Sequence, residues 1–282
     1  SLSNNNIPDL LTQLKNFIKF YLKATTLYNV HSSMVYQLLH FLFNNKIPES
    51  RASAYASVRK NLLNNNNTIE NHDLGAGSHK NIRGNTISIS HIAKTSMSGQ
   101  RKMQWLYNMS AYFRPSTAIE LGTSLGLSGS HIAANAERLI TIEGNSAIAA
   151  VAEQTFRMLN NSNIQCLIGN FDRVLPELLT IEQPDFIYLD GNHTYQATTE
   201  YFHLILEKTA GRRPVLVFDD IYWSSGMVKA WNEIKAHPEV RLTIDLYHFG
   251  LVLFNEDIIA PRHYKVVPYL WKPWHIGFKP VH

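Results

Sequence analysis

The hydrophobic pattern of the chain changes near residue 117. Before that point, residues 8–43 carry apolar side chains at helical spacing, and a second helical pattern runs from about 97 to 112. Beyond it, short apolar runs alternate with amphipathic stretches, and each run has the length of a strand. The seven runs are TAIEL, RLITIE, IQCLIG, DFIYLD, PVLVFDD, VRLTIDLYH and GLVLFN.

Helical patterns separate most of these runs. They lie at about 127–136, 145–160, 172–180, 194–208 and 224–236. Strands that alternate with such helices predict βαβ units and a mostly parallel sheet, which is an α/β fold. The connection between the last two runs, next to Gly250, is very short, so these runs predict an antiparallel hairpin.

Three parts of unequal length are expected. They are an N-terminal helical cap (1–95), a central domain (96–256) and an aromatic C-terminal extension (257–282). The first helix is basic and amphipathic, so it could lie on a membrane surface or hold a partner, although packing against its own domain is the simpler expectation. Residues 64–81 are rich in Asn and Gly and predict a loop. Its Gly75-Ala76-Gly77-Ser78 run lacks the strand and the lysine that a phosphate site needs, and we expect a turn there.

Composition narrows the class of protein. Of 282 residues, 45% are hydrophobic and 17% are charged, so a large core can form. The net charge of +4 is not gathered into a basic run, so no nucleic acid partner is expected. The single cysteine, Cys166, excludes an internal disulfide, favours a reducing compartment and is expected on a buried strand. No apolar stretch approaches a membrane span and no signal peptide is evident, so we expect a cytoplasmic protein without stable membrane insertion.

The segment AIELGTSLGLSGS, residues 118–130, carries the main chemical signal. A strand ends in an acid, and glycines and small hydroxyl residues follow before a helix. A Walker A loop would need a lysine that is absent, and the glycines at 122, 126 and 129 do not have dinucleotide-fingerprint spacing.

A serine hydrolase is one alternative. Gly122-Thr123-Ser124-Leu125-Gly126 matches the Gly-x-Ser-x-Gly elbow, and a later Asp219 or Asp220 and His248 follow in hydrolase order. However, the elbow would follow the first recognisable strand, no oxyanion segment precedes it, and Glu120 would have no role in acyl transfer.

A nucleoside site explains the acids better. Glu120 ends one strand, and Glu143 ends the next, about 20 residues further on, where a carboxylate can bind both ribose hydroxyls. Gly122 and Gly126 let the backbone approach a ligand closely. A ribose carboxylate without a phosphate signature predicts a nucleoside that lacks a pyrophosphate, and S-adenosylmethionine fits. A non-catalytic protein that binds an adenosyl ligand would share these features.

The run Glu120–Ser128 resembles the first motif of class I S-adenosylmethionine-dependent methyltransferases of the catechol O-methyltransferase-like group. The resemblance continues through IEGNSAIAAVAEQTF, IGNFDRVLPELL, FIYLDGNHTY and VLVFDDIYW, and covers roughly 95–256. It implies a Rossmann-like sheet of seven strands, with the last strand antiparallel, helices on both faces and an N-terminal helical cap. It also implies O-methyl transfer to a hydroxyl or carboxylate of a small molecule.

The resemblance further implies a set of cofactor residues. Ser128 would hold the methionine carboxylate, Glu143 the ribose, and the 169–171 segment the adenine, with the phenyl ring packed on it. The full set is Glu120, Gly122, Ser124, Gly126, Ser128, Glu143, Gly169, Asn170, Phe171 and Asp190.

A divalent cation, Mg²⁺ by preference, is the second implied cofactor. Its ligands would be Asp190, Asp219 and Asp220, although the group commonly has Asn at the third position. His193 stands where the group carries a lysine general base, so it is the expected catalytic residue. An Asp-Gly turn or a helix cap would explain the same acids without a metal. The sequence leaves open which molecule is the methyl acceptor and whether the protein forms a homodimer.

Overall fold

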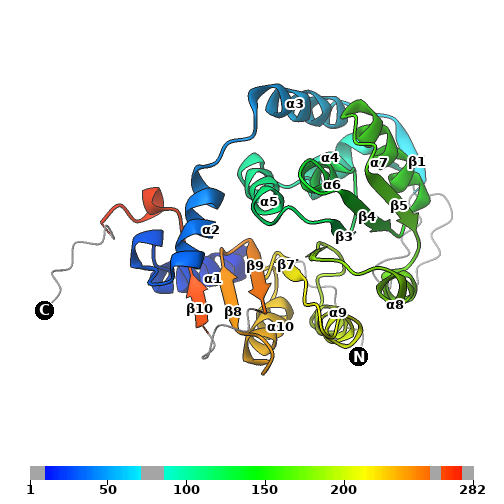
Figure 1. The fold of residues 1–282 in the computed structure, drawn as a ribbon. Helices are drawn as coiled ribbons and strands as arrows, with labels where there is room; N and C mark the ends of the chain where they lie inside the picture. The colour runs from blue at the N-terminus through cyan, green and yellow to red at the C-terminus, as the bar shows by residue number, and fades with distance from the viewer. Residues whose placement is uncertain (1–9, 71–85, 255–261, 275–282) are drawn as a thin grey trace, which may run out of the picture. The chain divides into compact units, whose positions relative to one another are not determined.

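The computed structural model describes residues 10–70, 86–254 and 262–274. The chain forms two compact units. The central unit is Asn44–Gly191, and the terminal unit combines Ser1–Phe43 with Asn192–His282. Figure 1 labels most of the elements of the two units, and each unit is described by itself below.

The central unit holds four parallel strands in the order β6-β3-β4-β5. All four residues of β6 are buried, and so are the last four of β3, as expected for parallel strands covered on both faces. In Figure 1, α8 lies on the opposite side of these strands from α6 and α7. The strands are β3 (Thr117–Leu121), β4 (Arg138–Glu143), β5 (Ile164–Ile168) and β6 (Phe186–Leu189).

Six helices and a short antiparallel ribbon complete the described part of this unit. Polar side chains fix several helix starts; Asn145, for example, accepts hydrogen bonds from the backbone of Ala147 (2.9 Å) and Ile148 (3.3 Å) at the start of α7. The ribbon is β1 (Thr68–Glu70) and β2 (Thr86–Ser88). The helices are α3 (Glu49–Leu63), α4 (Ile89–Ser96), α5 (Gln100–Phe113), α6 (Leu127–Ala133), α7 (Ser146–Met158) and α8 (Phe171–Ile181).

Helices α3 and α4 were not individually predicted from the sequence. Val58 and Leu62 of α3 pack in one apolar cluster with Ile92 of α4 and with Leu125 and Leu127 of the loop and helix that follow β3. Only three residues of α3 are buried, so its apolar pattern is sparse, and the helix is stabilised chiefly by this packing. The cluster therefore holds α3 against the glycine-rich loop.

The terminal unit contains a mixed sheet in the order β10-β8-β9-β7. The predicted antiparallel hairpin is confirmed as β8 and β9, and β9 is also antiparallel to β7. Its strands are β7 (Val215–Asp219), β8 (Leu242–Asp245), β9 (Phe249–Leu253) and β10 (Arg262–Lys265). Its helices are α1 (Leu10–Lys23), α2 (Ser33–Asn44), which crosses into the central unit at its last residue, α9 (Tyr195–Lys208) and α10 (Ser225–Ala236), with 3-10 turns η1 (Leu27–Asn29) and η2 (Tyr269–Trp271).

The expected count of seven strands needs correction, whereas β9, the last of the seven predicted strands, is antiparallel to β7 as expected. The order of the larger sheet includes eight strands, and the last, β10, is parallel to β8. The sequence RHYK carries no apolar run, so this strand forms because its backbone pairs with Leu242–Asp245. The α/β class and the mostly parallel Rossmann-like arrangement are confirmed.

Other expectations have mixed outcomes. Phe20 of α1 is fully buried and Ala24, just after the helix, almost fully, so this helix packs on its own unit, although Leu11, Ile18 and Leu22 remain exposed. Cys166 lies on β5 as predicted but is only half-buried, since β5 is the last strand in the order. The 64–81 segment contains β1, which was not predicted, and Gly75-Ala76-Gly77-Ser78 lies outside the described residues.

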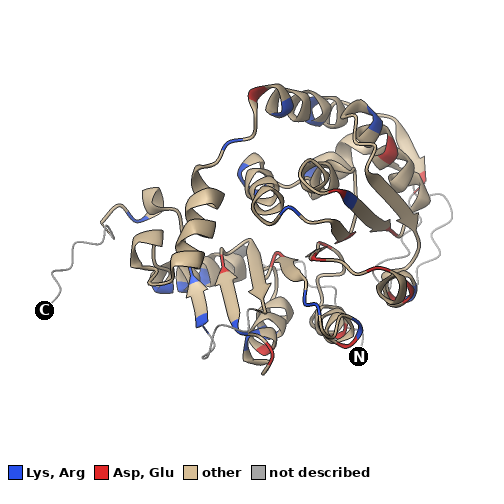
Figure 2. Cartoon of the chain, in the orientation of Figure 1, with Lys and Arg blue, Asp and Glu red and all other residues tan. Residues whose placement is uncertain are grey.

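The two units do not follow the three parts expected from the sequence, whose boundaries stay predictions. Among the described residues, no helix combines the length and the apolar character needed to cross a bilayer. Lys and Arg are scattered over the described elements of both units, as Figure 2 shows. The expected absence of a nucleic acid partner stays a prediction.

Candidate functional site

The loop after β3 is built on two glycines with left-handed backbone. Gly122 has φ +98° and Gly126 has φ +84°. A Cβ on Gly122 would collide with the carbonyl oxygen of Asp190, and one on Gly126 would lie 2.7 Å from the Phe156 ring. The backbone N–H of Gly122 donates to Ile142 O at 3.0 Å. Both positions therefore require glycine, and the loop is fixed against the ends of β4 and β6.

Glu143 holds the other side of this loop. Its Oε2 accepts the backbone N–H of Ser124 at 2.9 Å, and its Oε1 accepts that of Asn145 at 3.0 Å. The side chain is thus oriented at the end of β4, as a ribose-binding acid would need to be.

Glu120 lies fully inside the protein rather than on a ligand-facing surface. Its Oε2 accepts the hydroxyl of Thr141 at 2.7 Å, while Oε1 is buried and has no hydrogen-bond partner in the part of the chain that the structure describes. Burial raises the pKa of this carboxyl to about 8, and the negative charges of Asp190 and Glu143 add to the rise, against the hydroxyls of Ser128 and Thr141. Glu120 is therefore a buried neighbour of the predicted site and carries a proton near neutral pH.

A small cavity of about 30 Å³ opens beside the loop. Its lining brings together three predicted cofactor residues, Ser124, Ser128 and Asp190. It also contains residues that were not predicted from the sequence: Arg59 from α3, Met97 and Ser98 from the segment before α5, and Met103 from α5. No local pattern marks these residues, because they reach the loop only through the packing of α3 and α5.

The predicted adenine segment has a clear structural role at the start of α8. The side chain of Asn170 caps this helix by accepting the N–H of Asp172 at 2.7 Å. Phe171 is buried, and a Cβ on Gly191 would collide with its ring, while a Cβ on Gly169 would lie 2.7 Å from Val174. The ring thus packs on the backbone just beyond β6, and contact of this segment with an adenine stays a prediction.

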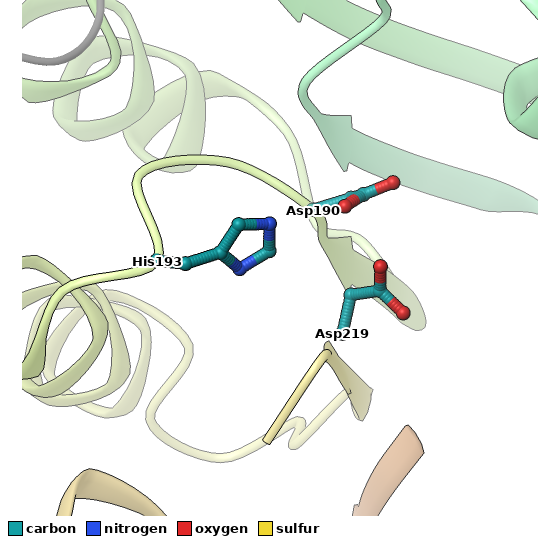
Figure 3. Close-up of side chains that lie close together, drawn as sticks. All are labelled: Asp190, His193 and Asp219. Atoms are coloured by element: carbon teal, nitrogen blue, oxygen red, sulfur yellow. The ribbon is translucent and has the colours of Figure 1, made fainter. Parts of the chain in front are cut away.

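Three side chains of the predicted metal and catalytic set lie together in Figure 3. Asp190, His193 and Asp219 each offer one ligand atom, and these atoms lie within 4.8 Å of one another. The hydroxyl of Tyr188 also donates to Asp190 Oδ2 at 3.0 Å. Two carboxylates and an imidazole at this spacing could hold one divalent cation.

Asp220, the third predicted metal ligand, is not in this group. It has φ +46°, and its N–H donates to His248 O at 2.8 Å. A role for Asp220 as a ligand stays a prediction.

Three aromatic residues that follow the predicted metal and catalytic residues in the sequence, Tyr195, Tyr222 and Trp223, differ in their surroundings. Tyr222 is buried, and its hydroxyl donates to Asp245 Oδ2 at 2.6 Å. Burial and the Asp245 charge raise the pKa of Tyr222 far above its ordinary value. The hydroxyl of Tyr195 donates to Glu233 at 2.6 Å on the surface, and Trp223 is exposed. Tyr222 is therefore a core residue of the terminal unit.

Part of the chain is similar in sequence to known methyltransferases. Residues 119–221 match the family model described as a methyltransferase domain, and no curated protein matches the chain. Among solved structures, an S-adenosylhomocysteine-bound methyltransferase from Podospora anserina superposes with a TM-score of 0.53 at 12% identity, covering 90% of this chain and 100% of its own. An O-methyltransferase from Bacillus cereus, also in complex with S-adenosylhomocysteine, gives 0.50 at 17% identity, covering 78% and 96%. A cofactor-bound protein from MTB gives 0.51 at 15% identity, covering 73% and 90%. At these identities the likeness establishes the fold.

Proposed function

We propose that the chain is an S-adenosylmethionine-dependent methyltransferase of class I, which transfers the methyl group to a hydroxyl oxygen of a small molecule with the help of a divalent cation. The observation that carries the proposal is the position of Glu143. This acid is oriented by Ser124 N–H and Asn145 N–H at the end of β4, beside a loop that tolerates no side chain at Gly122.

The cofactor would bind along this loop. Glu143 would accept the ribose hydroxyls, because two backbone N–H groups orient its carboxylate at the end of β4, next to this loop. Ser124 and Ser128 line the adjoining cavity and would meet the methionine part of the cofactor. Glu120, with its pKa raised to about 8 by burial, would be a neutral, buried neighbour of the loop and would add no negative charge to that of Glu143.

The donor set of Asp190, His193 and Asp219 fits a divalent cation. Carboxylate oxygens suit Mg²⁺, whereas an imidazole is a better ligand for transition metals such as Mn²⁺. If all three bind, we expect Mn²⁺ to be preferred over Mg²⁺. A bound cation would supply Lewis acidity, which lowers the pKa of an acceptor hydroxyl.

Methyl transfer from a sulfonium is an in-line displacement and needs an aligned, deprotonated oxygen. His193 is the candidate to take that proton, since a neutral imidazole has a basicity suited to the task. Its place beside Asp190 and Asp219 gives it a second candidate role, as a metal ligand. The two roles exclude each other for the same nitrogen, so the metal dependence of His193 variants separates them.

The serine hydrolase alternative is disfavoured. The methyltransferase model spans 119–221 and so includes Ser124, the residue that a hydrolase would use as its nucleophile. The Ser124 N–H is engaged by Glu143, an acid that acyl transfer does not require.

Calorimetric titration with S-adenosylmethionine and S-adenosylhomocysteine tests the proposal. We expect saturable binding of both by the wild-type protein, at least 10-fold weaker in Glu143→Ala. Glu153→Ala is the matched control, because Glu153 is an exposed acid on α7 outside the loop. Failure of the wild-type protein to bind either molecule, with or without Mn²⁺, would contradict the cofactor assignment.

A further inference from the structure

The central unit contains a second, much larger cavity that the cofactor site does not use. Its volume is about 440 Å³, within the range of small-molecule sites, roughly 300–1,000 Å³. Helices α3, α5 and α6 form its walls. Ser53 and Ala56 of its lining are exposed, so the cavity opens at the surface, and a concave, mainly apolar site of this size is the usual form of a ligand site.

The walls of this cavity are mainly apolar, and their polar groups are largely engaged. The ring of Tyr55 stacks on His131 with centroids 3.9 Å apart, and the Tyr55 hydroxyl donates to Ser130 O at 3.0 Å. Gln104 donates from Nε2 to Asn45 O and to Asn108 Oδ1. These bonds fix the walls and leave few groups that could attract a strongly charged ligand.

The charge of the lining is balanced and low. Glu49 and Arg59 are its two charged residues, and the Arg59 guanidinium donates to Ser98 O at 2.7 Å. Burial lowers the pKa of His131 to about 4, so its imidazole is neutral at physiological pH. His131 Nδ1 lies 2.6 Å from Leu127 O, which must accept, so Nε2 is left as a hydrogen-bond acceptor. An uncharged ligand with a hydroxyl or similar donor suits such walls.

The large cavity adjoins the small cavity at the cofactor loop. Both are lined by Arg59, Met103 and Leu127, and the small cavity also contains Ser124 and Asp190. A molecule that fills the large cavity and extends past the three shared residues would therefore arrive at the predicted cofactor and metal residues. Both cavities belong entirely to the central unit.

We propose that the cavity between α3, α5 and α6 binds the apolar body of the methyl acceptor, an elongated, uncharged molecule whose hydroxyl end reaches past Arg59 and Met103 toward Asp190. This inference rests on the proposed function, because it names the acceptor class for the same site. It also gives α3 a function, since this helix supplies half of the lining residues.

Two substitutions on α3 separate the cavity from the rest of the helix. Ala52 lines the cavity, whereas Ala54 is exposed and does not line it, so Ala52→Trp fills the space and Ala54→Trp is the matched control. Ala56 also lines the cavity and is exposed, so Ala56→Trp provides a second filling variant if Ala52→Trp fails to fold. Thermal melting checks the folding of all three.

The probes are 2-naphthol, 4-butylphenol and 4-phenylphenol, titrated by calorimetry into the protein with bound S-adenosylhomocysteine. We expect at least one to bind the wild-type protein and Ala54→Trp equally, and the filling variants at least 10-fold more weakly. With S-adenosylmethionine as donor, the filling variants should raise KM for that phenol and leave kcat within twofold.

Equal binding of the phenols by wild-type and filled variants would overturn the proposal, and so would no binding of any of the three. The titration with S-adenosylhomocysteine alone tests the proposed function independently of the cavity. If the wild-type protein does not bind that cofactor, the proposed function fails, while phenol titration of the cofactor-free protein still decides whether the cavity is a ligand site. Unchanged cofactor affinity in the filled variants identifies the loss as specific to the cavity.

Discussion

Gly122 lies directly against the carbonyl oxygen of Asp190, so closely that a Cβ at Gly122 would collide with it. The backbone N–H of Asp190 in turn donates to Leu121 O at 2.9 Å. This contact joins the end of β3 to the end of β6. The glycine loop and the Asp190 carboxylate are therefore positioned by one backbone packing, and a change at Gly122 should affect both.

Gly122→Ala is expected to destabilise the protein by about 2–4 kcal/mol, because it combines a left-handed φ with a backbone collision. Binding of S-adenosylhomocysteine should weaken at least 10-fold. Denaturant unfolding and calorimetry measure the two effects. Gly99→Ala is the control, since a Cβ there meets nothing within 4 Å, and a similar loss in both variants would contradict the argument.

Glu120 should make stability depend on pH in an unusual direction. Burial raises its pKa to about 8, so the native protein holds this proton at pH values where the unfolded chain has lost it. The free energy of unfolding should therefore fall as pH rises from about 5 to 8, by roughly 2–4 kcal/mol from this residue. Glu120→Gln should remove that part of the fall.

Urea unfolding at pH 5.5 and pH 8 measures this difference, with the exposed Glu153→Gln as control. Parallel pH dependence of the wild-type protein and Glu120→Gln would show that Glu120 titrates normally.

Asp219 and Asp220 should differ in their effect on turnover. Asp219 belongs to the group with Asp190 and His193, and Asp220 does not. Asp219→Asn should lower kcat at least 100-fold and weaken Mn²⁺ binding, whereas Asp220→Asn should change kcat less than fivefold. Asn tolerates the left-handed backbone at 220, so the control keeps its local structure.

Treatment with EDTA should likewise reduce turnover of the wild-type protein, and Mn²⁺ should restore it better than Mg²⁺. Full activity after chelation would contradict the metal role.

Tyr222 should matter for stability rather than for acceptor binding. Its hydroxyl donates to the buried Asp245 at 2.6 Å and receives a hydrogen bond from Lys265 Nζ at 2.9 Å. Tyr222→Phe leaves this buried acid short of a donor and should destabilise the protein by about 1–3 kcal/mol. Tyr195→Phe removes a surface hydrogen bond to Glu233 and should cost less than about 0.5 kcal/mol. Equal effects in denaturant unfolding would argue against the buried network.

The sequence determined the elements whose signal is local. Continuous apolar runs predicted β3 to β9, because buried parallel strands carry such runs, and amphipathic spacing predicted the helices between them. The glycine positions of the cofactor loop and the acid at the end of β4 were likewise visible, since turn chemistry depends on residue type.

Tertiary structure decided what depends on packing between distant segments. Helix α3 has a sparse apolar face, and its place against Leu125 and Leu127 follows from the shared cluster. Strand β10 is a strand only because its backbone pairs with β8. The large cavity exists because three helices from separate parts of the sequence leave space between them. No single stretch encodes such a space, because its walls meet only after the chain has folded.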